Sequence, residues 1–213
     1  MRIYKSPTIL RKVFPEALWK VDTNEKKIYL TFDDGPHEEI TMWVLEELKK
    51  YNAEGTFFCL GKHVRHRQQV VKNIIAAGHS IGNHSFNHLN GWKSSPGEYV
   101  RDVRSASEWI SSPLFRPPYG KLKFSQYESL KQHFQIVMWD VLSYDWDIKA
   151  DPGKSLKNVI KNTERGSIVV FHDSVKAYKN LKFMLPRYLE KFSEKGYTFS
   201  TLDPVMEARA KVG

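Results

Sequence analysis

The pattern of apolar and polar positions divides the chain into short apolar runs and longer amphipathic stretches. Apolar runs rich in β-branched and aromatic residues predict seven strands, at 26–32, 55–61, 79–83, 113–116, 134–141, 167–173 and 197–202. Apolar residues at helical spacing predict helices between them, at 38–52, 64–78, 98–110, 124–133, 151–166 and 180–196. Such alternation is typical of parallel β/α units.

Seven β/α units in a chain of 213 residues predict a barrel near the TIM type with one unit fewer than eight. A doubly wound open sheet is the alternative that the pattern leaves open. The basic and aromatic segment 1–25 precedes the first strand, and we expect it to pack on a single domain formed by residues 26–213. Pro186 lies inside the last predicted helix and predicts a kink there.

The net charge gives little information about the binding partners. The formal net charge is +9, which favours anionic partners, but the lysines are scattered and no nucleic-acid module is present, so nucleic acid is not expected. No stretch approaches the roughly 20 apolar residues of a membrane span. Segment 1–25 lacks the apolar core of a secretory signal, which predicts a cytoplasmic protein, while peripheral membrane contact and envelope association stay open. The sequence does not indicate the oligomeric state.

Ionisable residues follow five of the predicted strands. They are Asp33 and Asp34, His84 and His88, Arg116, Asp140 and Asp145, and His172 and Asp173. In a β/α barrel the carboxyl ends of the strands meet at one mouth, where such enzymes hold their active sites. Surface solvation does not explain this convergence, so the sequence predicts an active site there.

Two of these groups predict a metal centre. His84 and His88 are four residues apart, and on a helical turn their nitrogens would face the same side. With Asp33 or Asp34 they form a His₂-carboxylate set that suits a catalytic zinc with open positions. One aspartate then binds the metal, and the other is free to accept a proton from a metal-activated water.

Three further residues have candidate roles. His172 is a candidate general acid, with a hydrogen-bonded core histidine as the alternative. Arg116 could pair with the free aspartate, with a surface ion pair as the alternative. The rigid pair Pro117-Pro118 could aim the Tyr119 backbone N–H at a developing oxyanion.

Five short motifs carry a resemblance to a known family. "TFDDGP", "HSFNH", "RPPY", "DW" and "VFH" stand in the order and at the spacing of the NodB-homology polysaccharide deacetylases, carbohydrate esterase family 4. The resemblance spans roughly residues 26–202 and implies an α/β fold, a distorted (β/α)7 TIM-like barrel of NodB type. It also implies an enzyme, a metal-dependent hydrolase that removes the acetyl group from N-acetylglucosamine units of a glycan.

The resemblance implies a role for each matching residue. Asp33 would be the general base, held by Arg116, and His172 the general acid, oriented by Asp145. The metal ligands would be Asp34, His84 and His88, around Zn²⁺ or, as alternatives, Co²⁺ or another divalent ion. Substrate contacts would come from Tyr119 through its N–H, from Trp146 as a wall of the groove, and from Val170 in the pocket for the acetyl methyl.

Two positions depart from the family pattern. Leu142 stands where relatives often have an acidic residue, and Val170 stands where they usually have leucine. Neither is a predicted ligand, base or acid, so we expect an active enzyme acting on peptidoglycan, a chitin-like oligomer or a related glycan. The alternatives are a hydrolase of a small cyclic amide or ureide on the same fold, and a non-catalytic carbohydrate-binding module.

Overall fold

The strands form one curled parallel sheet in the computed structural model, which describes residues 2–203. They are β1 (Lys27–Asp33), β2 (Gly55–Cys59), β3 (Ser80–Asn83), β4 (Leu114–Phe115), β5 (Gln135–Ile136), β6 (Val141–Leu142), β7 (Ile168–His172) and β8 (Thr198–Phe199). The order is β5-β4-β3-β2-β1-β7-β6, and β8 pairs with the start of β1. Every pairing between these strands is parallel, so their carboxyl ends share one edge. The predicted α/β barrel of distorted (β/α)7 type is confirmed.

The predicted strand at 134–141 is wrong in one respect, because it is two short strands, β5 and β6, at opposite ends of the sheet. The segment before β1 lies against this break: Leu18 forms a parallel bridge with Val137, and Lys5 an antiparallel bridge with Val141. The backbone of this segment also bonds to Ile136, Met138, Asp140 and Leu142, while the N–H groups of Val137 and Asp140 donate to β4 and to β7. The boundary at residue 25 itself stays a prediction.

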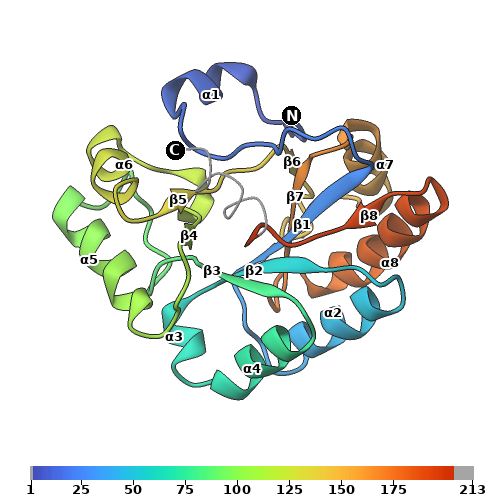
Figure 1. The fold of residues 1–213 in the computed structure, drawn as a ribbon, viewed down its shortest axis with the longest axis horizontal. Coiled ribbons are helices and arrows are strands. Elements are labelled where there is room, and N and C mark those ends of the chain that lie inside the picture. Colours follow the sequence, from blue (N-terminus) through green and yellow to red (C-terminus); the bar gives the residue numbers. More distant parts are fainter. Residues whose placement is uncertain (1, 204–213) are drawn as a thin grey trace.

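The helices surround the sheet (Figure 1). They are α1 (Thr8–Val13), α2 (Ile40–Lys49), α3 (Gly61–Val64), α4 (Gln68–Ala76), α5 (Pro96–Ser107), α6 (Phe124–Leu130), α7 (Pro152–Asn162) and α8 (Tyr178–Glu194), with a 3₁₀ turn η1 (Pro118–Gly120). Helix α5 begins at Pro96, directly after Ser95, because Ser95 and Glu98 form a capping box. Helix α8 continues through Pro186, and the predicted kink there stays a prediction.

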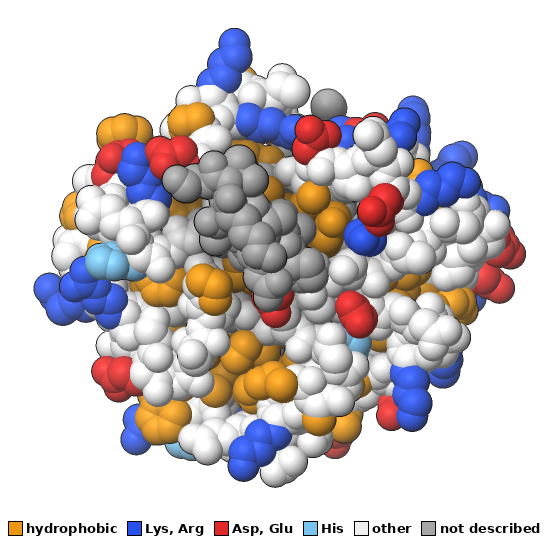
Figure 2. Space-filling view, in the orientation of Figure 1, with side chains coloured by type: hydrophobic (Ala, Val, Ile, Leu, Met, Phe, Trp, Pro, Cys, Tyr) orange, Lys and Arg blue, Asp and Glu red, His pale blue; other side chains and the backbone are white. Residues whose placement is uncertain are grey.

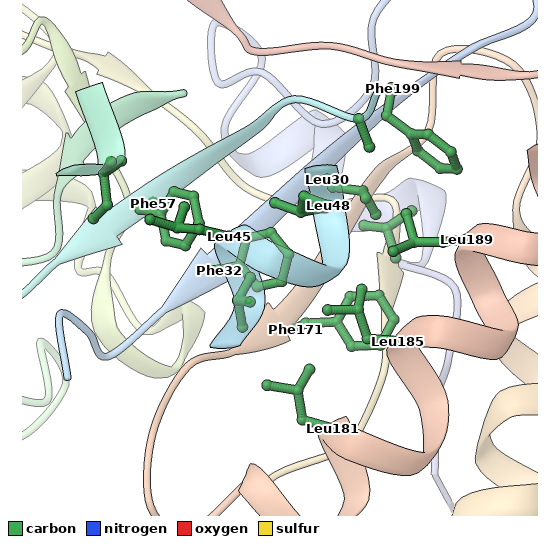
Figure 3. Close-up of a cluster of buried hydrophobic side chains, with 14 of the residues drawn as sticks. Leu30, Phe32, Leu45, Leu48, Phe57, Phe171, Leu181, Leu185, Leu189 and Phe199 are labelled. Carbon is green, nitrogen blue, oxygen red and sulfur yellow. The ribbon is translucent and has the colours of Figure 1, made fainter. Parts of the chain in front are cut away.

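The main apolar core lies between the sheet and helices α2 and α8. Phe32, Phe57 and Phe171 from neighbouring strands stack beside one another, with Leu45 and Leu185 above them (Figure 3). The apolar face predicted for α2 is buried, with Leu48 at 0% exposure. Strands β1, β2 and β7 are therefore held from one side, which fixes the positions of the polar residues at their ends.

Charged side chains are spread over the surface. In the view of Figure 2, Lys and Arg side chains lie around the edge of the molecule, interspersed with Asp and Glu, and form no continuous block. Among residues 2–203, no helix has the length and apolar character needed to cross a membrane. The cytoplasmic location expected from the sequence stays a prediction.

Candidate active site

Two adjacent carboxylates at the end of β1 point to different partners. Asp33 is paired in register with His172 of β7, so the two residues lie side by side at the carboxyl edge of the sheet. Asp34 has a φ of 79°, in the left-handed region, and this turn of the backbone separates its side chain from that of Asp33. Asp33 Oδ1 accepts a hydrogen bond from Arg116, whereas Asp34 Oδ1 faces two histidines.

Arg116 is fully buried and fixes Asp33. Its Nη1 donates to Asp33 Oδ1 and to Thr31 Oγ1, each at 2.7 Å, and its Nη2 donates to the carbonyl of Met138 at 2.9 Å. The guanidinium also lies 4.2 Å from the ring centre of Phe58. The alternative of a surface ion pair is therefore wrong: with a side-chain exposure of 0%, removing the arginine would leave the Asp33 carboxylate buried without its counter-charge.

Three side chains form a candidate ligand set for a cation. One ligand atom from each of Asp34, His84 and His88 lies within 4.8 Å of the others. Asp34 Oδ1 is 3.6 Å from Nε2 of His84 and 3.1 Å from Nε2 of His88. Two imidazole nitrogens and one carboxylate oxygen facing a common point fit a divalent ion with open coordination positions.

The predicted helical turn between the two histidines is wrong. Residues 84–88 form a loop, in which Ser85 and His88 both have a φ of 65°. The side chain of Asp102, on α5, accepts hydrogen bonds from the backbone N–H groups of Phe86 and Asn87 and so holds this loop. The nitrogens converge because of these bonds rather than by helical periodicity.

The second nitrogen of each histidine is also bonded. Nδ1 of His84 lies 2.9 Å from the carbonyl oxygen of Arg116, and Nδ1 of His88 lies 3.1 Å from the hydroxyl of Tyr119. Burial lowers the pKa of His84 to about 4, so the imidazole is neutral and its Nε2 lone pair is available. Burial opposes charge on Asp34 too, but the His88 hydrogen bond and the nearby histidines outweigh it and hold its pKa below the usual range. A neutral imidazole and an ionised carboxylate are the forms that bind metal.

The surroundings of His172 raise its pKa, whereas those of His84 lower it. Its Nδ1 lies 2.7 Å from Asp145 Oδ1, and its backbone N–H donates to Asp145 Oδ2 at 2.8 Å. Burial alone would lower the pKa of His172, but the charge and hydrogen bond of Asp145 raise it to about 9. At neutral pH this histidine carries a proton that it can donate, unlike an ordinary core histidine.

The candidate metal ligands and His172 line one cavity of about 450 Å³, which we call the active-site cavity. Asp33, Asp34, His84, His88 and His172 line it, together with the predicted substrate residues Tyr119, Trp146 and Val170. Arg116 and Asp145 stand behind it, fully buried. All ten predicted site residues thus belong to one cluster, while their chemical roles stay predictions.

Tyr119 occupies an unusual backbone conformation at this cavity. Its φ is 60°, and among residues 2–203 its N–H has no hydrogen-bond partner. Gly120 follows with a φ of 64°, and a Cβ there would collide with the Trp139 ring. A free N–H held in a tight turn at the edge of the cavity fits a donor to a developing oxyanion.

Comparison with known proteins identifies the family. The polysaccharide deacetylase profile matches residues 20–133, more than half of the chain. The chain belongs to the polysaccharide deacetylase family. It is 36% identical over 198 residues to a peptidoglycan-N-acetylglucosamine deacetylase of Bacillus cereus, covering 88% of this chain and 92% of that protein. It is 32% identical over 207 residues to the peptidoglycan-N-acetylmuramic acid deacetylase PdaA of Bacillus subtilis, covering 90% and 75%.

The solved structures agree with this family assignment. The crystal structure of the Bc1960 peptidoglycan N-acetylglucosamine deacetylase superposes with a TM-score of 0.84 at 30% identity, covering 92% of this chain and 95% of that one. The predicted family is confirmed. The predicted enzyme class, a hydrolase acting on N-acetyl amide bonds, is confirmed at the level of the polysaccharide deacetylase family.

Two ionisable residues that the sequence placed at the mouth lie elsewhere. Asp140 accepts from Ser167 at the start of β7, and Asp173 accepts from the Gly35 N–H and the Thr41 hydroxyl rather than facing the cavity. Two aromatic residues of the loop after β3 also lie outside the active-site cavity. Phe86 packs against the core, and Trp92 is exposed beside Lys121.

Several residues of this deacetylase-family site were not predicted from the sequence. Ser143 donates to Asp145 Oδ1 at 2.7 Å, and Asn180 of α8 donates to the Asp145 carbonyl at 3.0 Å. Trp139 and Lys176 line the active-site cavity. Ser143 stands two residues before Asp145 and could have been found as a local partner. Nothing in the sequence links Asn180, 35 residues away, to the backbone carbonyl of Asp145.

Proposed function

We propose that the protein removes the acetyl group from N-acetylglucosamine units of a peptidoglycan-type glycan. The names of the relatives support this substrate, since they act on N-acetylglucosamine or N-acetylmuramic acid in peptidoglycan. The observation that carries the proposal is the pairing of two opposed proton carriers in one cavity. Asp33, at the end of β1, is hydrogen-bonded to the buried Arg116. His172, which is paired in register with Asp33 on the neighbouring strand β7, is kept protonated by Asp145.

Asp33 is the proposed base. Arg116 occupies its Oδ1, while Oδ2 lies 4.0 Å from Nε2 of His84 and so faces the ligand set. From there Oδ2 can take a proton from the attacking water as it adds to the acetyl carbonyl. A divalent ion held by Asp34, His84 and His88, Zn²⁺ in our proposal with Co²⁺ as an alternative, would polarise the carbonyl and acidify that water.

His172 is the proposed acid. When the tetrahedral species collapses, the protonated imidazole gives its proton to the departing sugar nitrogen, and the C–N bond breaks to leave acetate and a free amine. The Tyr119 N–H stabilises the oxyanion before that step; loss of one such donor costs roughly 3 kcal/mol in other enzymes. Val170 contacts the acetyl methyl and Trp146 faces the sugar ring in this proposal, since both side chains line the cavity.

The test is acetate release from N-acetylglucosamine oligomers and from peptidoglycan by chelator-stripped protein, with and without added zinc. We expect release only with zinc, and we expect Asp33→Asn to bind the same amount of zinc with turnover reduced by about 10²–10⁴-fold. Zinc bound without release from either substrate would refute the proposal and favour the cyclic amide or ureide hydrolase. No release and no bound zinc would favour the carbohydrate-binding module.

A further inference from the structure

A second cavity adjoins the active-site cavity across the metal ligands. It has a volume of about 470 Å³, within the range of roughly 300–1,000 Å³ typical of ligand pockets. The two cavities share Asp34, His88 and Lys176. A polymer whose reacting unit lies in the active-site cavity can therefore extend with a neighbouring unit into the second one. We call the second cavity the basic cavity.

Three cationic side chains line the basic cavity: Lys62 of α3, Arg67 before α4, and Lys176 after β7. Among residues 2–203, Lys62 and Lys176 form no salt bridge. Arg67 Nε is buried and has no hydrogen-bond partner within that part of the chain. Its nearest carboxylate, on the exposed Glu38, stays 3.9 Å away. A buried guanidinium N–H without an acceptor is costly unless a ligand supplies one.

The carboxylates at this cavity do not neutralise the three cations. Asp34 faces the two histidines of the ligand set, and Asp173 is 1% exposed and already accepts from Gly35 and Thr41. The active-site cavity differs, because aromatic and aliphatic side chains make up much of its wall. The two halves of this surface therefore suit different parts of a substrate, one an acetylated sugar face and the other an anionic group.

We propose that the basic cavity binds a carboxylate that the glycan carries next to the reacting N-acetylglucosamine, so that the protein selects anionic over neutral polymers. This inference rests on the proposed deacetylase function. The carboxylate can belong to a lactyl ether on the neighbouring sugar or to a peptide attached to it. In both cases Arg67 and Lys62 supply charge-assisted hydrogen bonds to the carboxylate oxygens.

The experiment compares kcat/KM for acetate release from three substrates of equal length. One is a neutral N-acetylglucosamine tetramer, one alternates N-acetylglucosamine with N-acetylmuramic acid bearing free lactyl carboxylates, and one carries peptides on the lactyl groups. The variants are Arg67→Gln and Lys62→Gln. The control is Lys72→Gln, an exposed lysine of α4 that does not line either cavity.

We expect the preference for the anionic tetramers, as a ratio of kcat/KM values, to fall about five- to tenfold in each cavity variant and to stay unchanged in the control. The fall should lie in KM rather than in kcat, and added salt should reduce the preference of the unmodified protein. A larger effect on the lactyl or on the peptide substrate identifies the source of the carboxylate. Equal losses on neutral and anionic substrates, or none, would overturn the inference while leaving the proposed function intact.

A binding measurement separates the two proposals. Titration calorimetry of the metal-free protein with the neutral and the lactyl-bearing tetramer reports on the basic cavity without turnover. If no substrate releases acetate, the proposed function fails, yet tighter binding of the anionic tetramer that is lost in Arg67→Gln would still support the anionic subsite. Equal binding of both tetramers would refute it.

Discussion

The substitution Asp145→Asn should convert His172 from a proton donor to a neutral imidazole at neutral pH. Asp145 accepts hydrogen bonds from the backbone N–H and from Nδ1 of His172. Asparagine has nearly the same side-chain volume but carries no charge. Burial lowers the pKa of His172, and Asp145 is the largest influence that raises it to about 9. Without that charge, we expect a pKa below the ordinary value of 6.5.

The size of this effect follows from the two pKa values. The difference between 9 and 6.5 corresponds to about 3.4 kcal/mol of lost stabilisation of the imidazolium. Because the acid must carry its proton, activity is lost as the pH rises through its pKa. At pH 8 the protonated fraction falls from about 0.9 to about 0.03, so we expect the rate to fall about 30-fold there. The alkaline limb of the pH profile should move to lower pH.

Two measurements check this prediction. The pH dependence of kcat/KM for acetate release gives the shift of the limb, and an NMR titration of the His172 ring gives the pKa itself. Ser143→Ala is the matched control, since it removes one hydrogen bond to the Asp145 carboxylate and one from the Asp145 N–H but keeps the carboxylate charge, so the limb should move much less. If the ring in Asp145→Asn still titrates near pH 9, the reasoning is wrong.

The other predictions concern the metal ligands and the buried arginine. His84→Ala should remove one ligand nitrogen and lose bound zinc; an undiminished zinc content by elemental analysis would exclude His84 from the ligand set. Tyr119→Phe keeps the backbone N–H but removes the hydroxyl that contacts Nδ1 of His88, so we expect zinc affinity, measured by competition with a chelator, to fall about tenfold. Unchanged affinity would mean that this contact does not position the ligand. Arg116→Met should leave Asp33 buried without its counter-charge and lower the free energy of unfolding in urea by about 3–5 kcal/mol. A loss below about 1 kcal/mol would show that Asp33 finds another partner or takes up a proton.

Residues at strand ends could be placed from the sequence because parallel strands share one carboxyl edge. Asp33 and His172 follow separate apolar runs, and the sheet register puts them opposite each other. The shape of the loops could not be predicted in this way. In the loop of residues 84–88, Ser85 and His88 adopt left-handed backbone conformations. Asp102 holds this loop, and no local pattern connects its side chain with the loop.

The split of the predicted strand at 134–141 has a similar cause. The run "FQIVMWDV" has the apolar character of one strand, but its carbonyls at Val137 and Met138 accept from Arg116, and the Met138 N–H donates to Leu18. Distant partners therefore decide the backbone path here. Leu142 and Val170, the two residues that depart from the family pattern, both line the active-site cavity.

The position of the segment before β1 has a consequence for the order in which the protein forms during synthesis. Arg2 bonds to Asp147 and Arg11 to Asp140, partners that lie 145 and 129 residues further along the chain. Leu18 and Trp19 are also buried, at 3% and 5% exposure, in clusters that include Val137 and Met138 respectively. Because synthesis proceeds at about 5–20 residues per second, the partners of these apolar side chains leave the ribosome on the order of ten seconds later. Strands β1 to β3 can pair in that interval, whereas the wall of the active-site cavity formed by Leu142, Val170 and His172 is completed only after β7 has been synthesised.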